Sequence, residues 1–168
     1  FCTKKTPDET ANYMGRLKVL DAIKRISKKV YVIGTGQLAL NCSESILARG
    51  IVPHVYEYGA LPNSLLESRC NKRNIPFVRA DKMDLTKVLL EETEDALIVS
   101  ANSTYIIPGI VLSKTNIYGV NFHPGLLPAH KGRNAEAWAI YEQDEFSGVT
   151  WHELSADIDS GAIVAQER

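Results

Sequence analysis

The chain has few cysteines and no long hydrophobic run. Its 168 residues include three cysteines, Cys2, Cys42 and Cys70, which lie far apart and form no C-x-x-C pair. This spacing argues against a cysteine-based zinc site or a disulfide framework, and it favours reduced thiols in the cytoplasm. No apolar run approaches the ~20 residues that a membrane-spanning helix needs, and no signal-peptide pattern opens the chain. We therefore predict a cytoplasmic protein with no membrane partner.

An excess of charge of one sign is also missing. The chain has 19 Lys and Arg residues against 20 Asp and Glu residues, a formal net charge of −1. A protein whose main partner is a nucleic-acid backbone needs a basic excess, so we expect no nucleic-acid partner. A local basic cluster, Lys24, Arg25, Lys28 and Lys29, is typical of a solvated helix face.

The first 29 residues differ from the rest in their pattern of polar and apolar residues. Residues 1–15 are polar and show little periodicity, whereas residues 16–29 space their apolar residues three or four apart, as an amphipathic helix does. We predict an N-terminal extension over residues 1–29 with a short helix. A single compact domain over residues 30–168 follows, and the length suffices for a buried core.

Strand-like and helix-like segments alternate along this domain. The predicted strands are 30–33, 52–56, 76–79, 96–101 and 117–122, and the predicted helices are 37–49, 63–74, 84–92, 108–114 and 134–143. We expect Gly50 to end the first helix, and Asp84 and Asn134 to act as N-caps. Alternation of this kind predicts a doubly wound α/β fold, a mostly parallel Rossmann-like sheet with helices on both faces. Two late strands, 149–154 and 163–166, predict a mixed sheet edge.

A glycine turn follows the first strand. Residues 34–39 read G-x-G-x-x-A, the pattern of a dinucleotide-binding turn at a helix N-terminus. Such a site also needs an acidic residue about twenty positions further on, and Glu57 matches this requirement only loosely. A tight strand-to-helix turn explains the glycines equally well, so an NAD-dependent oxidoreductase stays open as an alternative.

The stretch with the most candidate functional residues comes at the end of the predicted strand 117–122. Asn121 and His123 lie two residues apart, so their side chains leave the same face of the sheet. That end is the carboxyl edge, where open α/β sheets bind their ligands. Pro124 keeps His123 out of helical geometry, and Pro128 stiffens the loop beyond. We favour a functional site over a simple strand end.

Three other features are less specific. The acidic loop 157–161 lacks the spaced oxygens and closing Glu of a calcium loop, and by itself it reads as a turn. His123, His130 and His152 match no zinc signature, so we expect no metal. Arg133 either meets an anionic part of a substrate or is a solvated loop residue.

Taken together, these motifs resemble the catalytic domain of folate-dependent formyltransferases. The similarity is carried by Asn121-x-His123-Pro124, Leu126-Leu127-Pro128, Gly148-Val149-Thr150 and Asp159-Ser160-Gly161-Ala162-Ile163. The family includes glycinamide ribonucleotide, methionyl-tRNA and amino-sugar formyltransferases and a formyltetrahydrofolate deformylase. Residues 132–139 and 148–152 look most similar to the formyltransferase-like domains of nonribosomal peptide synthetases, and they also suit stand-alone amino-sugar enzymes.

The resemblance implies a role for each matching residue. The family's catalytic trio falls on Asn121, His123 and Asp159. Its folate pocket, built largely from backbone, falls on two segments: Tyr105, Ile106 and Ile107, then Ser155, Ala156, Asp157 and Ile158. Substrate contacts are expected from Arg133, Asn134 and His152.

The implied reaction moves a formyl group from 10-formyltetrahydrofolate to a primary amine on a small or carrier-tethered substrate, through a tetrahedral intermediate. Residues 30–168 are then a formyltransferase catalytic domain. The tRNA enzyme's extra C-terminal domain has no counterpart here, so a tRNA substrate is not expected. Two alternatives remain beside the oxidoreductase: hydrolysis of the formyl donor, and a binding domain without turnover.

Overall fold

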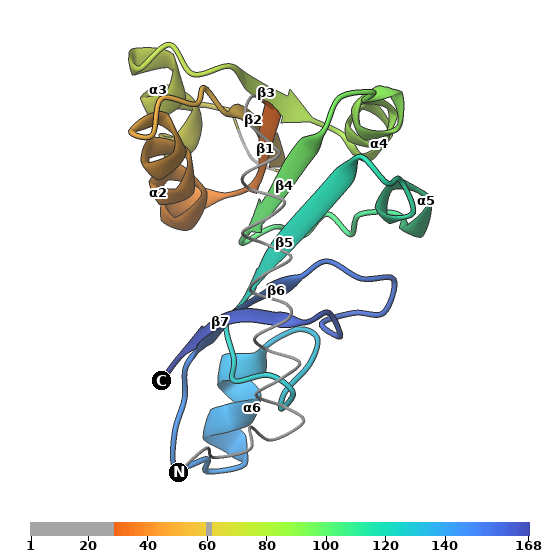
Figure 1. Ribbon diagram of the computed structural model, residues 1–168. Helices are drawn as coiled ribbons and strands as arrows, with labels where there is room; N and C mark the ends of the chain where they lie inside the picture. Colours follow the sequence, from red (N-terminus) through yellow and green to blue (C-terminus); the bar gives the residue numbers. More distant parts are fainter. Residues whose placement is uncertain (1–28, 60–61) are drawn as a thin grey trace, which may run out of the picture.

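The computed structural model describes residues 29–59 and 62–168. The predicted N-terminal extension lies outside the described residues, apart from Lys29, which begins the first strand. The described residues form one seven-stranded sheet in the order β3-β2-β1-β4-β5-β6-β7 (Figure 1). The predicted doubly wound, mostly parallel α/β fold is confirmed.

Five strands run parallel and two late strands run antiparallel. The parallel strands are β1 (Lys29–Gly34), β2 (His54–Tyr58), β3 (Phe77–Ala80), β4 (Ala96–Ala101) and β5 (Ile117–His123). The antiparallel strands are β6 (Val149–Glu153) and β7 (Ile163–Glu167), which extend the sheet beyond β5. The helices are α2 (Gly36–Leu47), α3 (Leu65–Lys72), α4 (Lys82–Glu91), α5 (Gly109–Leu112) and α6 (Ala135–Tyr141).

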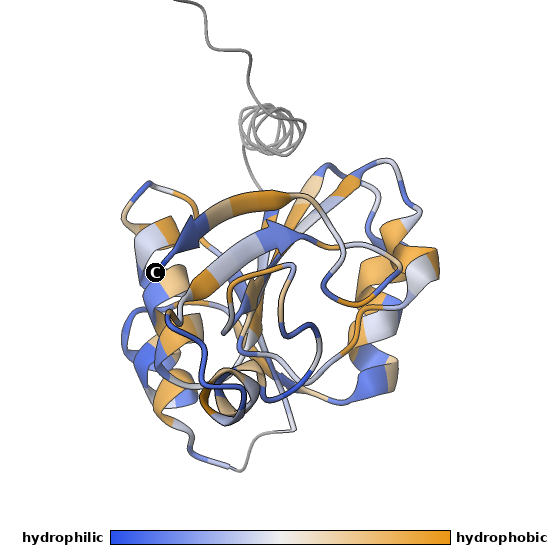
Figure 2. Cartoon of the chain, turned by 90° about the horizontal axis from the view of Figure 1, so that it is seen from below, coloured by the Kyte–Doolittle hydropathy of each residue, from blue (hydrophilic) through white to orange (hydrophobic). Residues whose placement is uncertain are grey.

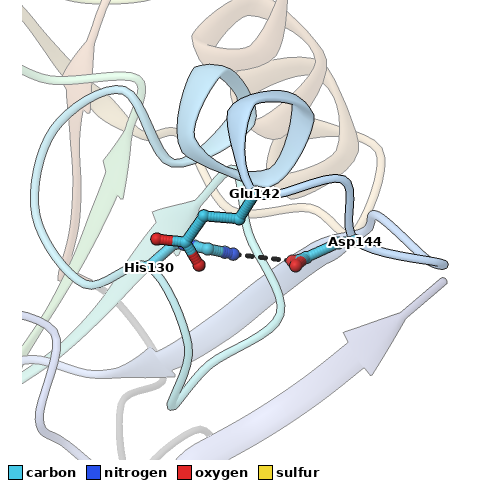
Figure 3. Close-up of side chains that lie close together, drawn as sticks. All are labelled: His130, Glu142 and Asp144. Carbon is cyan, nitrogen blue, oxygen red and sulfur yellow. Dashed lines mark hydrogen bonds and ion pairs between the residues drawn. The ribbon is translucent and has the colours of Figure 1, made fainter.

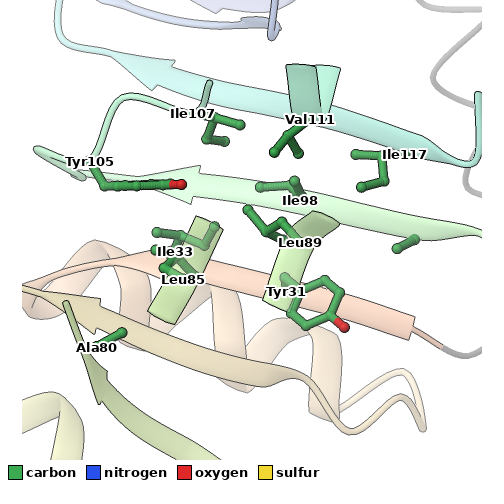
Figure 4. Close-up of a cluster of buried hydrophobic side chains, with 11 residues drawn as sticks. Tyr31, Ile33, Ala80, Leu85, Leu89, Ile98, Tyr105, Ile107, Val111 and Ile117 are labelled. Atoms are coloured by element: carbon green, nitrogen blue, oxygen red, sulfur yellow. The ribbon is translucent and has the colours of Figure 1, made fainter. Parts of the chain in front are cut away.

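Successive side chains of a strand point to opposite sides of the sheet, and helices cover both sides, so both faces are buried. Val30 and Val32 of β1 pack with residues of α2 and α3, whereas Tyr31 and Ile33 pack with residues of α4 and α5 (Figure 4). Figure 2 shows hydrophobic residues along the strands and on the helices, and hydrophilic residues in the connecting loops. Burying each large apolar side chain contributes about 1.5–3 kcal/mol.

Several predicted boundaries shift for local reasons. The second strand begins at His54 rather than at Val52, because Pro53 has no N–H for a sheet that continues on both sides. Asp84 is not an N-cap. The cap is Asp81, whose carboxylate accepts the N–H of Asp84 at 2.8 Å.

The helix that was predicted to end before Gly50 also ends earlier. α2 stops at Leu47 with Ala48 as its C-cap, and Gly50 (φ +80°) donates its N–H to the carbonyl of Leu47. Glycine suits this left-handed position after the helix, so the type of signal was correct and its position was not.

Cys42 and Cys70 are free thiols. Burial raises the pKa of both, and it raises the pKa of Cys70 to about 11. Neither is a thiolate at neutral pH, so neither is a candidate nucleophile.

Candidate active site

The glycine turn after β1 is explained by its contact with β4. A Cβ on Gly34 would lie 1.8 Å from the carbonyl oxygen of Ala101, so only glycine fits. Thr35 donates its N–H to the same oxygen and its hydroxyl to the carbonyl of Asn102, at 3.3 and 3.0 Å. These groups join two strand ends. The structure therefore supports the interpretation of a tight turn over that of a dinucleotide site.

Glu57, the acid that a dinucleotide site would need, is also engaged elsewhere. Its side chain is buried and accepts a hydrogen bond from the Ser64 hydroxyl at 2.5 Å. The same hydroxyl accepts the N–H of Glu67 and caps α3. A ribose hydroxyl that bound this oxygen of Glu57 would have to compete with the Ser64 hydroxyl.

The three predicted catalytic residues come together at the carboxyl edge of β5. The register of β5 and β6 places Asn121 opposite His152, and the Asn121 Nδ2 lies 3.1 Å from the His152 Nε2. The Asp159 carboxylate bridges the two histidines. Its Oδ2 lies 3.2 Å from the His123 Nδ1 and its Oδ1 lies 3.2 Å from the His152 Nε2. Asn121, His152, Asp159 and His123 thus form one connected chain.

This chain is nearly closed to solvent. The side chains of His123, His152 and Asp159 are 3%, 2% and 10% exposed. His152, predicted to contact substrate, presents almost no surface and instead packs between Asn121 and Asp159. Hydrogen bonds and charges act more strongly in such a low-dielectric setting.

Asp159 is held in an unusual conformation. Its φ of +48° lies in the left-handed region, which costs a residue with a side chain about 1–3 kcal/mol. The N–H of Gly132 donates to its Oδ2 at 2.8 Å. Two residues on, a Cβ on Gly161 would lie 1.8 Å from the carbonyl oxygen of Glu153. The glycine of the Asp-x-Gly pattern is therefore a steric requirement of a loop that folds back on β6.

The hydrogen bonds constrain where the protons lie. The His123 Nε2 is 2.9 Å from the carbonyl oxygen of His130, and the His152 Nδ1 is 2.8 Å from the carbonyl oxygen of Glu153. A carbonyl only accepts, so both of these ring nitrogens carry protons. If both rings were neutral, their lone pairs would face the Asp159 carboxylate. A proton between the His123 Nδ1 and the Asp159 Oδ2 satisfies that contact, whereas the His152 Nε2 can accept an N–H of the Asn121 amide at 3.1 Å.

A second set of contacts fixes the loop that follows His123. The Thr150 hydroxyl donates to the carbonyl of Gly125 at 2.6 Å and accepts the N–H of Leu127 at 3.2 Å. The Gln166 amide donates to both Leu127 O and Thr150 Oγ1, each at 2.9 Å. Gly125 leaves room for the His123 ring, because a Cβ there would lie 2.9 Å from the His123 Nε2.

Sequence reasoning gave no role to Thr150 and did not single out Gln166. Both lie on late strands whose pairing with the loop depends on tertiary contacts. The one local signal is the position of Thr150 itself: it is polar and lies two residues before His152, on the same face of β6.

The two predicted folate segments flank the same part of the core. Tyr105 and Ile107 are buried in the cluster against which Leu154, the residue before Ser155, packs. Ile106 and Ile158 are 66% and 60% exposed and face outward from the two segments. Ser155 donates its hydroxyl to the carbonyl of Asp157, which shapes the second segment, and Ala156 lies exposed between them.

The predicted substrate residues lie at the start of α6. Arg133 is exposed and makes no hydrogen bond or ion pair with any residue of ranges 29–59 and 62–168. Asn134 is the N-cap residue of α6, as predicted, but its side chain makes no capping hydrogen bond and its φ is +61°. Both side chains are therefore available to a ligand. Within the described part of the chain, no helix is long and apolar enough to cross a membrane.

Comparison with known proteins agrees with this geometry. The sequence profile described as "Formyl transferase" matches residues 62–168, which include all of Asn121, His123 and Asp159. GDP-perosamine N-formyltransferase of Brucella melitensis is 39% identical over 145 residues, covering 83% of this chain and 56% of that protein. Methionyl-tRNA formyltransferase of Chlorobium chlorochromatii is 26% identical over 155 residues, covering 83% and 49%. The chain thus spans about half the length of these relatives.

Solved structures show the same fold. Phosphoribosylglycinamide formyltransferase of Bacillus halodurans superposes with a TM-score of 0.66 at 25% identity, covering 83% of this chain and 78% of that one. A sugar 3-N-formyltransferase crystallised with dTDP and 5-N-formyl-THF gives a TM-score of 0.67 at 24% identity, covering 83% and 50%. The predicted family is confirmed, whereas the particular likeness to nonribosomal peptide synthetase domains stays a prediction. By its profile match, this chain belongs to the formyl transferase family.

Proposed function

We propose that this chain carries the catalytic domain of an enzyme that moves a formyl group from 10-formyltetrahydrofolate to a primary amine. The observation that carries the proposal is the connected chain Asn121–His152–Asp159–His123 at the carboxyl edge of the sheet. Neither hydride transfer nor simple binding needs a buried carboxylate between two imidazoles and beside an amide.

Each side chain has a chemical task in this reaction. The amine nitrogen bonds to the formyl carbon, the carbonyl electrons move onto oxygen, and the bond from that carbon to the folate nitrogen then breaks. Asn121 donates to the oxyanion, a contact whose loss costs about 10²–10³ in rate. His123 and Asp159 take the proton that the amine releases and return one to the leaving nitrogen, worth about 10²–10⁴.

The donor site is proposed on segments 105–107 and 155–158. Backbone groups of irregular segments can read the polar edge of a pterin ring, and Ile106 and Ile158 offer exposed apolar surface to its faces. A structure with a reduced folate bound away from both segments would contradict this placement.

For the acceptor, we propose an amino sugar carried on a nucleoside diphosphate. The Brucella relative acts, by its name, on GDP-perosamine, and the sugar 3-N-formyltransferase was crystallised with dTDP. A cavity of about 530 Å³ lies beside the loop that follows β5 (residues 124–134, here the catalytic loop), and it is lined by Ala129, His130, Lys131, Trp138, Glu142 and Asp144. Exposed Arg133 lies next to this loop and can pair bidentately with a diphosphate.

The deciding assay supplies the formyl donor alone, then with GDP-perosamine, a dTDP-linked amino sugar, or an aminoacyl thioester. We expect a formamide product with a sugar nucleotide and little free formate without an amine. Equal formate release in every arm would replace the transferase by a hydrolase, and turnover of the thioester alone would indicate a carrier-tethered acceptor.

Arg133→Ala sharpens the acceptor proposal. We expect KM for the sugar nucleotide to rise roughly 10-fold, the loss of one or two charge-assisted hydrogen bonds, with the KM for the formyl donor unchanged. Arg168→Ala is a control, since that guanidinium packs on Phe146 instead.

A further inference from the structure

His130 of the catalytic loop makes a hydrogen bond with an acidic side chain that follows α6. The His130 Nε2 lies 2.6 Å from the Asp144 Oδ2, and the two side chains are 10% and 34% exposed (Figure 3). A carboxylate only accepts, so the ring donates from Nε2. Glu142 approaches the other ring nitrogen, Nδ1, at 4.0 Å and is 55% exposed, which makes it a weak contact.

The backbone of His130 makes the contact that matters for chemistry. Its φ is +50°, a left-handed conformation that an L-residue adopts at a cost of about 1–3 kcal/mol unless something holds it. In this conformation its carbonyl accepts the proton of the His123 Nε2 at 2.9 Å. One residue thus joins Asp144, through its side chain, to the catalytic imidazole, through its carbonyl.

We infer that Asp144 is a positioning residue for His123 and acts through His130. When the ring of His130 is held, the strained backbone stays left-handed and its carbonyl keeps the His123 ring turned with Nδ1 toward Asp159. When the ring is released, residue 130 relaxes to negative φ, the carbonyl turns away, and His123 loses one of its two anchors. The inference rests on the proposed function for its kinetic consequence, and not for its structural one.

A divalent cation held by the same three side chains is the competing explanation. His130, Glu142 and Asp144 each offer a ligand atom, and these atoms lie within 4.8 Å of one another. An imidazole gives a metal one nitrogen, however, and here the two carboxylates approach different nitrogens of the ring. The geometry fits a clamped ring better than a coordination sphere.

The kinetic test compares Asp144→Ala with Asp144→Asn. Asparagine keeps an acceptor oxygen for the His130 ring but no charge, so we expect Asp144→Asn to keep a far higher kcat than Asp144→Ala. Both are measured at saturating acceptor, because Asp144 also lines the proposed acceptor cavity. We expect Asp144→Ala to lower kcat up to about 100-fold, as misplacement of a catalytic group does, with the KM for the formyl donor unchanged. Exposed Glu145, which makes no contact with the site, provides the control variant Glu145→Ala.

Two kinetic outcomes would overturn the inference. Asp144→Ala with wild-type kcat removes the role altogether. Equal losses in both Asp144 variants, with activity that EDTA abolishes and Zn²⁺ restores, would replace the clamp by a cation site.

A second measurement does not depend on catalysis. The chain has four histidines, so their ring nitrogens can be resolved by ¹⁵N NMR. In Asp144→Ala and His130→Ala we expect the His123 ring to average between tautomers. In His130→Gln, whose amide nitrogen reaches the position of the imidazole Nε2 and can still donate to Asp144, we expect the wild-type His123 signals.

Unchanged His123 signals in both alanine variants would refute the coupling, even if the protein proved to have no formyltransferase activity. Conversely, altered signals in a protein that formylates no amine would keep the coupling and overturn the proposed function. If Asp144→Ala does not fold, the His130 pair alone decides.

Discussion

Two buried carboxylates at opposite edges of the same sheet differ in what surrounds them. Glu92, at the amino edge, accepts the backbone N–H groups of Thr93 and Glu94 at 2.9 Å, a hydrogen bond from the Tyr31 hydroxyl, and an ion pair from Lys29 at 3.2 Å. Asp159, at the carboxyl edge, faces two imidazoles instead. Lysine, tyrosine and backbone donors keep their protons at neutral pH, whereas imidazoles exchange theirs.

The contrast separates a structural charge from one at the proposed reactive site. Burial by itself would raise the pKa of Glu92, but the hydrogen bonds from Tyr31, the Glu94 N–H and Lys29 outweigh it and lower the pKa to about 2. Lys114 adds to this cluster by donating to the carbonyls of Leu90 and Glu92, at 2.6 and 2.5 Å, which closes the end of α4. Every group there is satisfied in one protonation state. Asp159 instead lies between two imidazoles, the side chains that commonly exchange protons near neutral pH.

The largest expected effect concerns the reactive edge. His123→Ala should cut turnover by about 10²–10⁴, because it removes the proton carrier next to Asp159. Steady-state kinetics with the formyl donor and the sugar nucleotide would measure it. Folate affinity should hold, since the predicted donor segments do not include residue 123. A variant that turns over at the wild-type rate would show that Asp159 does not act through His123 in the reaction.

Glu92→Ala should have the opposite profile. It leaves the Tyr31 hydroxyl and Lys29 without their buried partner, and breaking a buried pair in this way costs about 3–5 kcal/mol. Chemical denaturation measures this cost. We expect kcat per folded molecule to match the wild type, and a large drop in kcat would mean that the amino edge communicates with the site.

The same carboxylate should give a pH signature. The pKa of Glu92 lies at about 2 in the folded chain and at 4.5 for the free side chain. A depressed pKa stabilises the fold above the unfolded value, and this stability is lost as the pH falls from 4.5 towards 2. The loss amounts to about 3 kcal/mol. Denaturation at a series of pH values should show it in the wild type and not in Glu92→Gln; equal pH slopes would contradict the assignment.

The smallest of these effects concerns Thr150, which pairs with His123 at the carboxyl edge. Thr150→Val removes the hydroxyl that bonds Gly125, Leu127 and Gln166, at a cost of about 1–3 kcal/mol for buried groups left unsatisfied. Because this hydroxyl holds the loop after His123, turnover should fall as well. Ser43→Ala is the matched control, since it removes a buried hydroxyl bonded within α2, far along the chain from the loop. Loss of stability in both variants with no loss of turnover in Thr150→Val would limit Thr150 to a structural role.

Local patterns predicted most of the fold because periodicity is a local property. The strand Ala96–Ala101 was predicted to the residue, since its apolar run is buried on both faces and flanked by polar residues. Ends were less predictable. Asp81 and Asp84 are the same residue type and are equally good caps. The choice between them depends on where the preceding strand β3 ends, which is at Ala80.

The sequence alone determined that Asn121 and His123 leave one face of a strand at the carboxyl edge, because side chains alternate along a strand whatever surrounds it. Its motifs also singled out Asp159 and the family. Only the tertiary structure decided that Asp159 lies between two imidazoles, that Thr150 and Gln166 hold the loop, and that Asp144 reaches His130. These contacts join segments 7 to 39 positions apart in the chain. They depend on how β6 and β7 pair with β5, and no local spacing carries that information.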